Sequence, residues 1–293
     1  MDLPEKPQLY LISPVEFEHC RELAMPSGSL FEFSSRFLPV DQLEPLLALY
    51  ALTGAICSIS RSPVDDEVKW AKLKWWSDEL IAEPELPSRH PVLRALRQSG
   101  ARSRIDNSLI LGLLHEVARQ IDAAPSADEH ALFDRLSQSG AAEFNLELAL
   151  DAARIEENTK GFLAAASSVF RLISSFGPGQ RRETDQIPMS LLAEFNVSST
   201  QLKEDPGSAE SAGIVLNLAA LGEDWFAQGL SDLKVVSGNE PGAGSVTHLQ
   251  LRWALEKRIM GRIKEDVHGF LASGLRYGPA DAWFSWRFLR HLQ

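Results

Sequence analysis

The amino-acid sequence predicts an all-α fold, a single large helical bundle around a central cavity that spans residues 1–293 as one domain. Apolar residues recur at helical spacing along the whole chain, and no segment shows the alternation typical of a β-strand. Proline or glycine marks the breaks between these segments, as at Gly177-Pro178-Gly179. Hydrophobic residues make up 44% of the 293 residues, enough for a sizeable core.

Six helices are expected in the first half of the chain, over residues 14–23, 30–38, 41–60, from 65 onwards, 91–96 and 107–121. Pro14 and Pro91 suit the first position of a helix, whereas Pro39 ends the second helix because the residue before a proline avoids helical geometry. Asp65 and Asp66 suit a helix start, where carboxylates accept hydrogen bonds from backbone N–H groups. In the helix that follows, we expect Trp70, Trp75 and Trp76 to pack in the core.

Five further helices are expected in the second half, over residues 128–153, 158–175, 208–233, 247–274 and 280–291. Breaks are predicted at residues 205–207, which read Asp-Pro-Gly, and across the glycine-rich segment 238–244.

The composition indicates in which compartment the protein occurs and which classes of partner it does not bind. Cys20 and Cys57 lie far apart, which is no disulfide framework and fits a reducing compartment. The net charge of −11 argues against general binding to nucleic acids or to anionic membranes. Residues 1–6 lack the pattern of a secretory signal, and the uncharged run between Glu44 and Arg61 contains proline, glycine and serines, so it favours a buried core helix over a membrane span. We therefore expect a cytoplasmic protein without a transmembrane segment.

Several segments occur in the order known from one enzyme family. These are residues 31–39, Ala48-Leu49-Tyr50-Ala51, Leu73-Lys74-Trp75-Trp76-Ser77-Asp78-Glu79-Leu80, His90-Pro91-Val92-Leu93-Arg94-Ala95-Leu96, and Ile187-Pro188 followed by residues 191–197. Together they resemble the squalene/phytoene synthases, which implies the isoprenoid-synthase type of helical bundle. The resemblance covers about residues 29–197.

The resemblance also locates two metal motifs, and both are degenerate here. The first family motif is an aspartate-rich helix, but its acidic positions are occupied by Cys57, Ser58 and Arg61. Counting back from Pro188, the positions of the second motif are occupied by Arg171, Ser175, Pro178 and Gly179. The family's acids hold Mg²⁺, which requires oxygen ligands that these side chains do not supply. We therefore predict no metal, and we expect Cys57, Ser58 and Arg61 to face the mouth of the cavity.

Other charged residues are weaker candidates for a diphosphate or metal site. Arg181 and Arg182 follow the second motif and are the remaining candidates for diphosphate contacts, although a solvated loop explains them as well. The acids at 65–67 and at 223–224 are interpreted as a helix start and a solvated helix face. No zinc-binding or phosphate-loop pattern occurs, and Cys57 is interpreted as a core residue because burial keeps a thiol protonated.

Three functions remain open. The first is a non-catalytic protein that acts in binding or assembly, similar to the family branch that contains a mitochondrial complex I assembly factor and that also lacks the aspartates. The second is an isoprenoid- or lipid-binding protein. The third is an active prenyltransferase that joins two prenyl diphosphates head-to-head with Mg²⁺ as cofactor. The expected partners are a prenyl or other lipid-like ligand in the cavity, or a protein; a peripheral position at a membrane is compatible with each.

Overall fold

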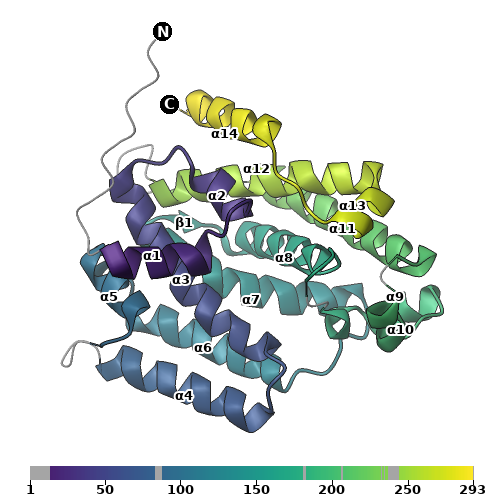
Figure 1. Cartoon of the computed structure of the whole chain (residues 1–293), viewed down its shortest axis with the longest axis horizontal. Helices are drawn as coiled ribbons and strands as arrows, with labels where there is room; N and C mark the ends of the chain where they lie inside the picture. The colour runs from purple at the N-terminus through teal and green to yellow at the C-terminus, as the bar shows by residue number, and fades with distance from the viewer. Residues whose placement is uncertain are drawn as a thin grey trace.

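The computed structural model describes residues 14–82, 88–180, 183–205, 207–231, 233, 235–236 and 244–292. These residues form an all-α bundle, as predicted (Figure 1). The α-helices are α1 (Pro14–Ala24), α2 (Leu30–Ser35), α3 (Val40–Arg61), α4 (Asp66–Ala82), α5 (Pro91–Gln98), α6 (Asn107–Ile121), α7 (Glu129–Ala149), α8 (Glu157–Ser174), α9 (Met189–Glu194), α10 (Ser199–Glu204), α11 (Ala209–Ser231), α12 (Gly244–Glu265), α13 (Val267–Ser273) and α14 (Pro279–Leu292). Two 3₁₀ turns, η1 (Arg102–Arg104) and η2 (Thr184–Gln186), complete the helical elements of the described residues.

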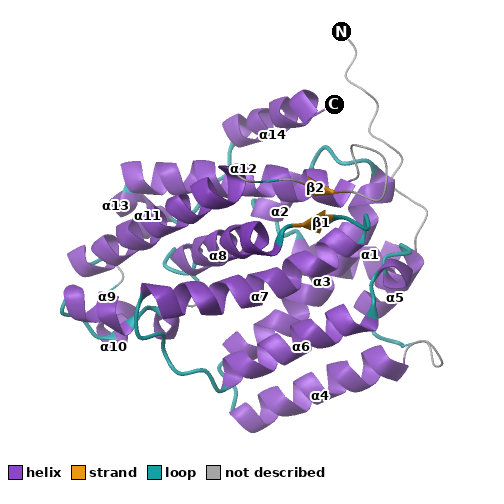
Figure 2. Ribbon diagram, turned by 180° about the vertical axis from the view of Figure 1, so that it is seen from behind, coloured by secondary structure: helices purple, strands orange, loops and turns teal. Residues whose placement is uncertain are grey.

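One pair of short strands lies outside the all-helical expectation. β1 (Arg154–Ile155) pairs antiparallel with β2 (Val235–Val236), so the segment after α7 is joined to the segment after α11 (Figure 2). Each strand has only two residues, which are too few to show the alternating pattern of a β-strand in the sequence.

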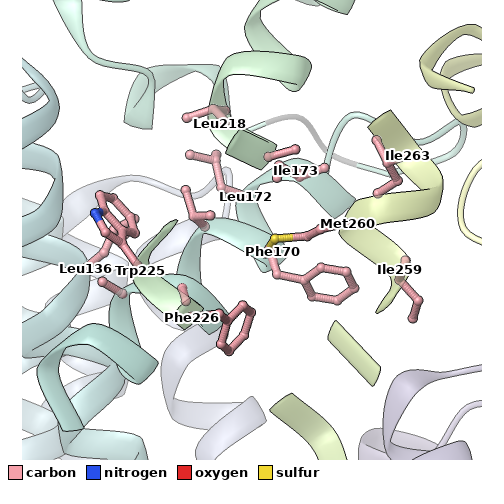
Figure 3. Close-up of a cluster of buried hydrophobic side chains, with 14 of the residues drawn as sticks. Leu136, Phe170, Leu172, Ile173, Leu218, Trp225, Phe226, Ile259, Met260 and Ile263 are labelled. Carbon is pink, nitrogen blue, oxygen red and sulfur yellow. The ribbon is translucent and has the colours of Figure 1, made fainter. Parts of the chain in front are cut away.

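The main core lies where α8 packs against α7 and α11. Buried side chains from these helices and from α12 form one cluster, in which Phe170, Ile173, Leu218, Phe226 and Met260 meet (Figure 3). α7 and α8 approach closely at Gly140, where an added Cβ would lie 2.7 Å from the carbonyl oxygen of Ala164. Gly140 therefore allows the backbones of α7 and α8 to approach each other at this point.

A second core surrounds α3, which packs against α1, α5 and α6. Among the described helices, α3 alone is long and apolar enough to cross a membrane by length and composition, and 56% of that apolar window is buried inside the protein. Its burial agrees with the expectation of a core helix.

Two expectations about helices were wrong. The segment 247–274 is not one helix, because α12 ends at Glu265 and the Asp266 side chain accepts a hydrogen bond from Gly269 N at the start of α13. On α4, Trp76 is buried as expected, but Trp70 and Trp75 are each 42% exposed. One face of α4 covers α6 and the other faces solvent.

Candidate functional site

The two segments predicted to correspond to the family's metal motifs meet at one cavity. Its volume is about 720 Å³, and its wall is built from the ends of α3 and α8, from α12, and from the segments around residues 28–30 and 273–277. Ser58 and Arg61 line it from α3, and Arg171, Ser175 and Pro178 line it from the end of α8 and the turn that follows. Segments separated by more than one hundred residues are thus brought to the wall of one cavity.

The remaining predicted positions lie elsewhere. Cys57 is 8% exposed and lines a smaller neighbouring cavity of about 220 Å³, rather than the mouth of the large one. Gly179 is exposed in the turn after α8, with a φ of 76° that favours glycine. Arg181 and Arg182, the candidates for diphosphate contacts, lie outside the described residues.

Three arginines around the cavity are each paired with a carboxylate. Arg171 Nη1 lies 2.8 Å from Glu143 Oε1, and Arg252 Nε lies 2.8 Å from Glu256 Oε1. Arg61 Nη1 lies 3.4 Å from Glu183 Oε1. The three cations and three anions cancel, so these pairs give the wall no net charge.

A chain of buried hydrogen bonds runs behind this wall. Glu147 Oε1 lies 2.6 Å from Nδ1 of His248, whose Nε2 lies 2.9 Å from Ser34 Oγ. On the other side, Tyr50 donates to Glu147 Oε2 at 2.8 Å and accepts from Arg252 at 2.8 Å. The chain links α2, α3, α7 and α12, and it fixes Arg252 at the cavity wall.

The charges of the network shift the ionisation of its members. Burial raises the pKa of the Cys57 thiol to about 12, with Glu143 adding to the effect, so the sulfur stays protonated. Burial would also raise the pKa of Glu143, but the charges of Arg171, Arg252 and Arg61 outweigh it and hold that pKa below its usual value. Glu143 is therefore an ionised partner of Arg171, whose own pKa is raised mainly by Glu143.

The residues at the two motif positions do not fit Mg²⁺. This ion binds oxygen ligands, usually carboxylates together with phosphate oxygens and water. The motif positions supply a thiol, two hydroxyls and two guanidinium groups, and the nearby carboxylates of Glu143 and Glu183 are bound to arginines. Among the described residues, no group of three or more histidine, cysteine, aspartate or glutamate side chains is arranged to hold a metal ion.

The other acidic clusters have structural partners. Asp66 begins α4 and pairs with Lys69 at 2.7 Å. Glu223, on α11, pairs with Lys264 of α12. Neither cluster is among the residues that line the cavity.

Sequence reasoning missed the buried polar network. Glu143 and Glu147 lie one turn apart on α7 among Phe144, Leu146 and Leu148, which are buried. Acidic residues inside an apolar run were the available signal, because a buried charge requires a partner. The partners Arg171, His248 and Arg252 come from other helices, so the pairing itself depends on the fold.

Comparison with known proteins shows the family of the chain. The sequence pattern of the family described as "Squalene/phytoene synthase" matches residues 26–255, more than half of the chain. The chain belongs to the squalene/phytoene synthase family. No curated protein matches it by sequence.

Three solved structures share the fold at low sequence identity. Squalene synthase HpnC from Alicyclobacillus acidocaldarius is 17% identical, with a TM-score of 0.61 over 86% of this chain and 96% of that chain. A dehydrosqualene synthase in complex with ligand is 14% identical, with a TM-score of 0.64 over 95% of each chain. YisP from Bacillus subtilis is 12% identical, with a TM-score of 0.61 over 94% of this chain and 95% of that chain.

Proposed function

We propose that this protein is a non-catalytic member of the squalene/phytoene synthase family that holds a prenyl or other lipid-like ligand in its central cavity. One observation carries the proposal: the two segments that the resemblance assigns to the metal motifs line the cavity, and their arginines Arg61 and Arg171 are paired with glutamates. It follows that the protein needs no Mg²⁺ to bind this ligand.

The charge balance of the wall argues against ionisation of a prenyl diphosphate. Loss of diphosphate develops negative charge on the leaving oxygen, which preorganised cations must stabilise. Arg171 and Arg61 each already bind a carboxylate, and replacing that carboxylate by a substrate would leave a glutamate unpaired. The pairs therefore favour binding without turnover.

The remainder of the wall suits an apolar chain. Leu30, Phe170, Leu275 and Tyr277 line the cavity beside the polar residues. A volume of about 720 Å³ lies within the range of ligand-binding pockets. The structure of a dehydrosqualene synthase in complex with ligand supports a ligand-binding role for this fold. The same wall does not identify a protein partner.

Binding and turnover are separable by experiment. Calorimetry with farnesol and with farnesyl diphosphate, both in the presence of a chelator, is expected to detect binding to the purified protein. Ser174→Trp should weaken it, because Ser174 lines the cavity and an indole would occupy part of the space that a ligand needs. Ser231→Trp, at the exposed end of α11, is the matched control and should bind as the unmodified protein does. Failure of both ligands to bind, or equal binding by the S174W variant, would contradict the proposal.

A further inference from the structure

The C-terminal helix α14 presents an aromatic and basic stripe to solvent. Trp283 and Trp286 are three residues apart, as are Arg287 and Arg290, and each arginine follows one of the tryptophans by four residues. The four residues therefore share one face of the helix. Trp283 is 57% exposed and Trp286 is 42% exposed, and both arginines are exposed. We call these four residues the α14 stripe.

The opposite face of α14 fixes the helix to the protein. The buried Asp281 carboxylate lies 3.2 Å from Arg262 and 3.5 Å from Arg258, both on α12. Phe284 and Phe288 pack against a small core that contains Leu251, Leu255 and Phe33. Both views place α14 at the edge of the molecule, beyond α12 (Figures 1 and 2). The stripe is therefore held outward by a helix that is anchored through the buried Asp281 carboxylate and the two arginines that pair with it.

The charge of the stripe is opposite to that of the protein. Arg287 stacks 5.4 Å from the ring centre of Trp283, and Arg290 stacks 4.8 Å from that of Trp286. The single acidic residue of α14 is Asp281, which is buried on the other face. The chain as a whole carries a net charge of −11, so the stripe is a local basic site on an acidic molecule.

We propose that the α14 stripe is a docking surface for an anionic lipid membrane. Tryptophan rings favour the boundary between headgroups and acyl chains, and arginines attract acidic headgroups across the same boundary. A second copy of this chain is a poor occupant, because a symmetric contact would bring the same arginines of both copies together. The segment that leads into α14 contributes Leu275 and Tyr277 to the cavity wall, so docking would bring one rim of the cavity towards the bilayer.

Vesicle binding by the full chain tests the proposal directly. Co-sedimentation is expected with vesicles of phosphatidylcholine and phosphatidylserine, but not with phosphatidylcholine alone, and added salt should weaken it. Arg287→Gln with Arg290→Gln should lower the partition coefficient at least about tenfold. Trp283→Phe with Trp286→Phe should lower it less but should reduce the quenching of tryptophan fluorescence by brominated lipid, because the quenched rings are lost.

A second exposed pair supplies the matched control. Trp70→Phe with Trp75→Phe on α4 removes two rings that are each 42% exposed, and it should leave vesicle binding and lipid quenching unchanged. Absence of binding to the anionic vesicles would overturn the proposal, as would an equal loss in the α4 variant. So would a dimer in sedimentation velocity that disappears in the α14 variants while vesicles remain unbound, since that result assigns the stripe to a second copy.

Discussion

Glu143 Oε1 on α7 lies 2.8 Å from Arg171 Nη1 on α8, and Cys57 Sγ on α3 lies 3.8 Å from the same oxygen. One carboxylate oxygen thus contacts a residue from each of the two segments that were predicted to correspond to the family's metal motifs. An arginine–glutamate ion pair and a protonated thiol lie between the helices α3, α7 and α8, next to positions that the resemblance assigns to the metal motifs.

Removal of one partner of this pair should destabilise the fold. Arg171→Met leaves the Glu143 carboxylate in a largely buried site, and we expect the free energy of unfolding to fall by about 2 kcal/mol. Because the Arg171 side chain keeps 34% exposure, the loss should be smaller than for a fully buried pair. Adding Glu143→Leu should recover most of it. Urea unfolding of both variants measures the change, and a double variant less stable than Arg171→Met would contradict this account.

Acid should weaken the same pair. The folded-state pKa of Glu143 is lowered, despite burial, by Arg171, Arg252 and Arg61, so this group stabilises the fold above its unfolded pKa of about 4.3. That contribution should disappear as the pH falls through the folded pKa. Glu143→Gln should therefore flatten the dependence of unfolding free energy on pH below about 4.3. An unchanged acid profile in the variant would show that Glu143 does not carry this effect.

Both cysteines should resist modification in the folded protein. Burial, assisted by Glu143 at Cys57 and by Glu16 at Cys20, raises the pKa of each thiol to about 12. At pH 8 the reaction with a disulfide reagent should be at least about a hundredfold slower than after denaturation. Rapid labelling of one thiol in the native state would contradict the burial of that residue.

The close crossing of α7 and α8 should be sensitive to one methyl group. Gly140→Ala places a Cβ 2.7 Å from the Ala164 carbonyl oxygen, which cannot move without the backbone, so we expect a loss of about 1–3 kcal/mol. Gly161→Ala is the matched control, since its Cβ would meet nothing closer than Ser137 at 3.8 Å. That variant should be neutral or more stable by up to about 1 kcal/mol. Equal thermal stability of the two variants would exclude this packing argument.

Short sequence windows predicted most of the helices, but they did not predict the buried polar network. Proline at the start of α5 and the apolar face of α6 are visible in short windows, and these helices lie where they were predicted. The break at Asp266 was missed because helix-forming residues continue on both sides of it. Trp70 and Trp75 were misplaced because both faces of α4 carry large apolar residues, and periodicity does not say which face is covered.

The candidate site depends on contacts between distant segments. The resemblance to a family located the motif positions, and the fold brings Arg61 and Arg171 to one cavity. Their partners Glu183 and Glu143 have no spacing signal, since each lies on a different element. The same holds for His248 and Glu147, which are 101 residues apart.

Release of pyrophosphate tests the central proposal most directly. The unmodified protein, incubated with farnesyl diphosphate or geranylgeranyl diphosphate and Mg²⁺, is expected to release none above background, because neither degenerate motif supplies a carboxylate to hold the metal. Acids restored at Cys57, Ser58 and Arg61 should not recover activity, since the positions of Arg171 and Ser175 would still lack them. Metal-dependent release by the unmodified protein that is lost on mutation of Asp65 and Asp66, or of Glu223 and Asp224, would contradict the account and show that the metal site lies elsewhere.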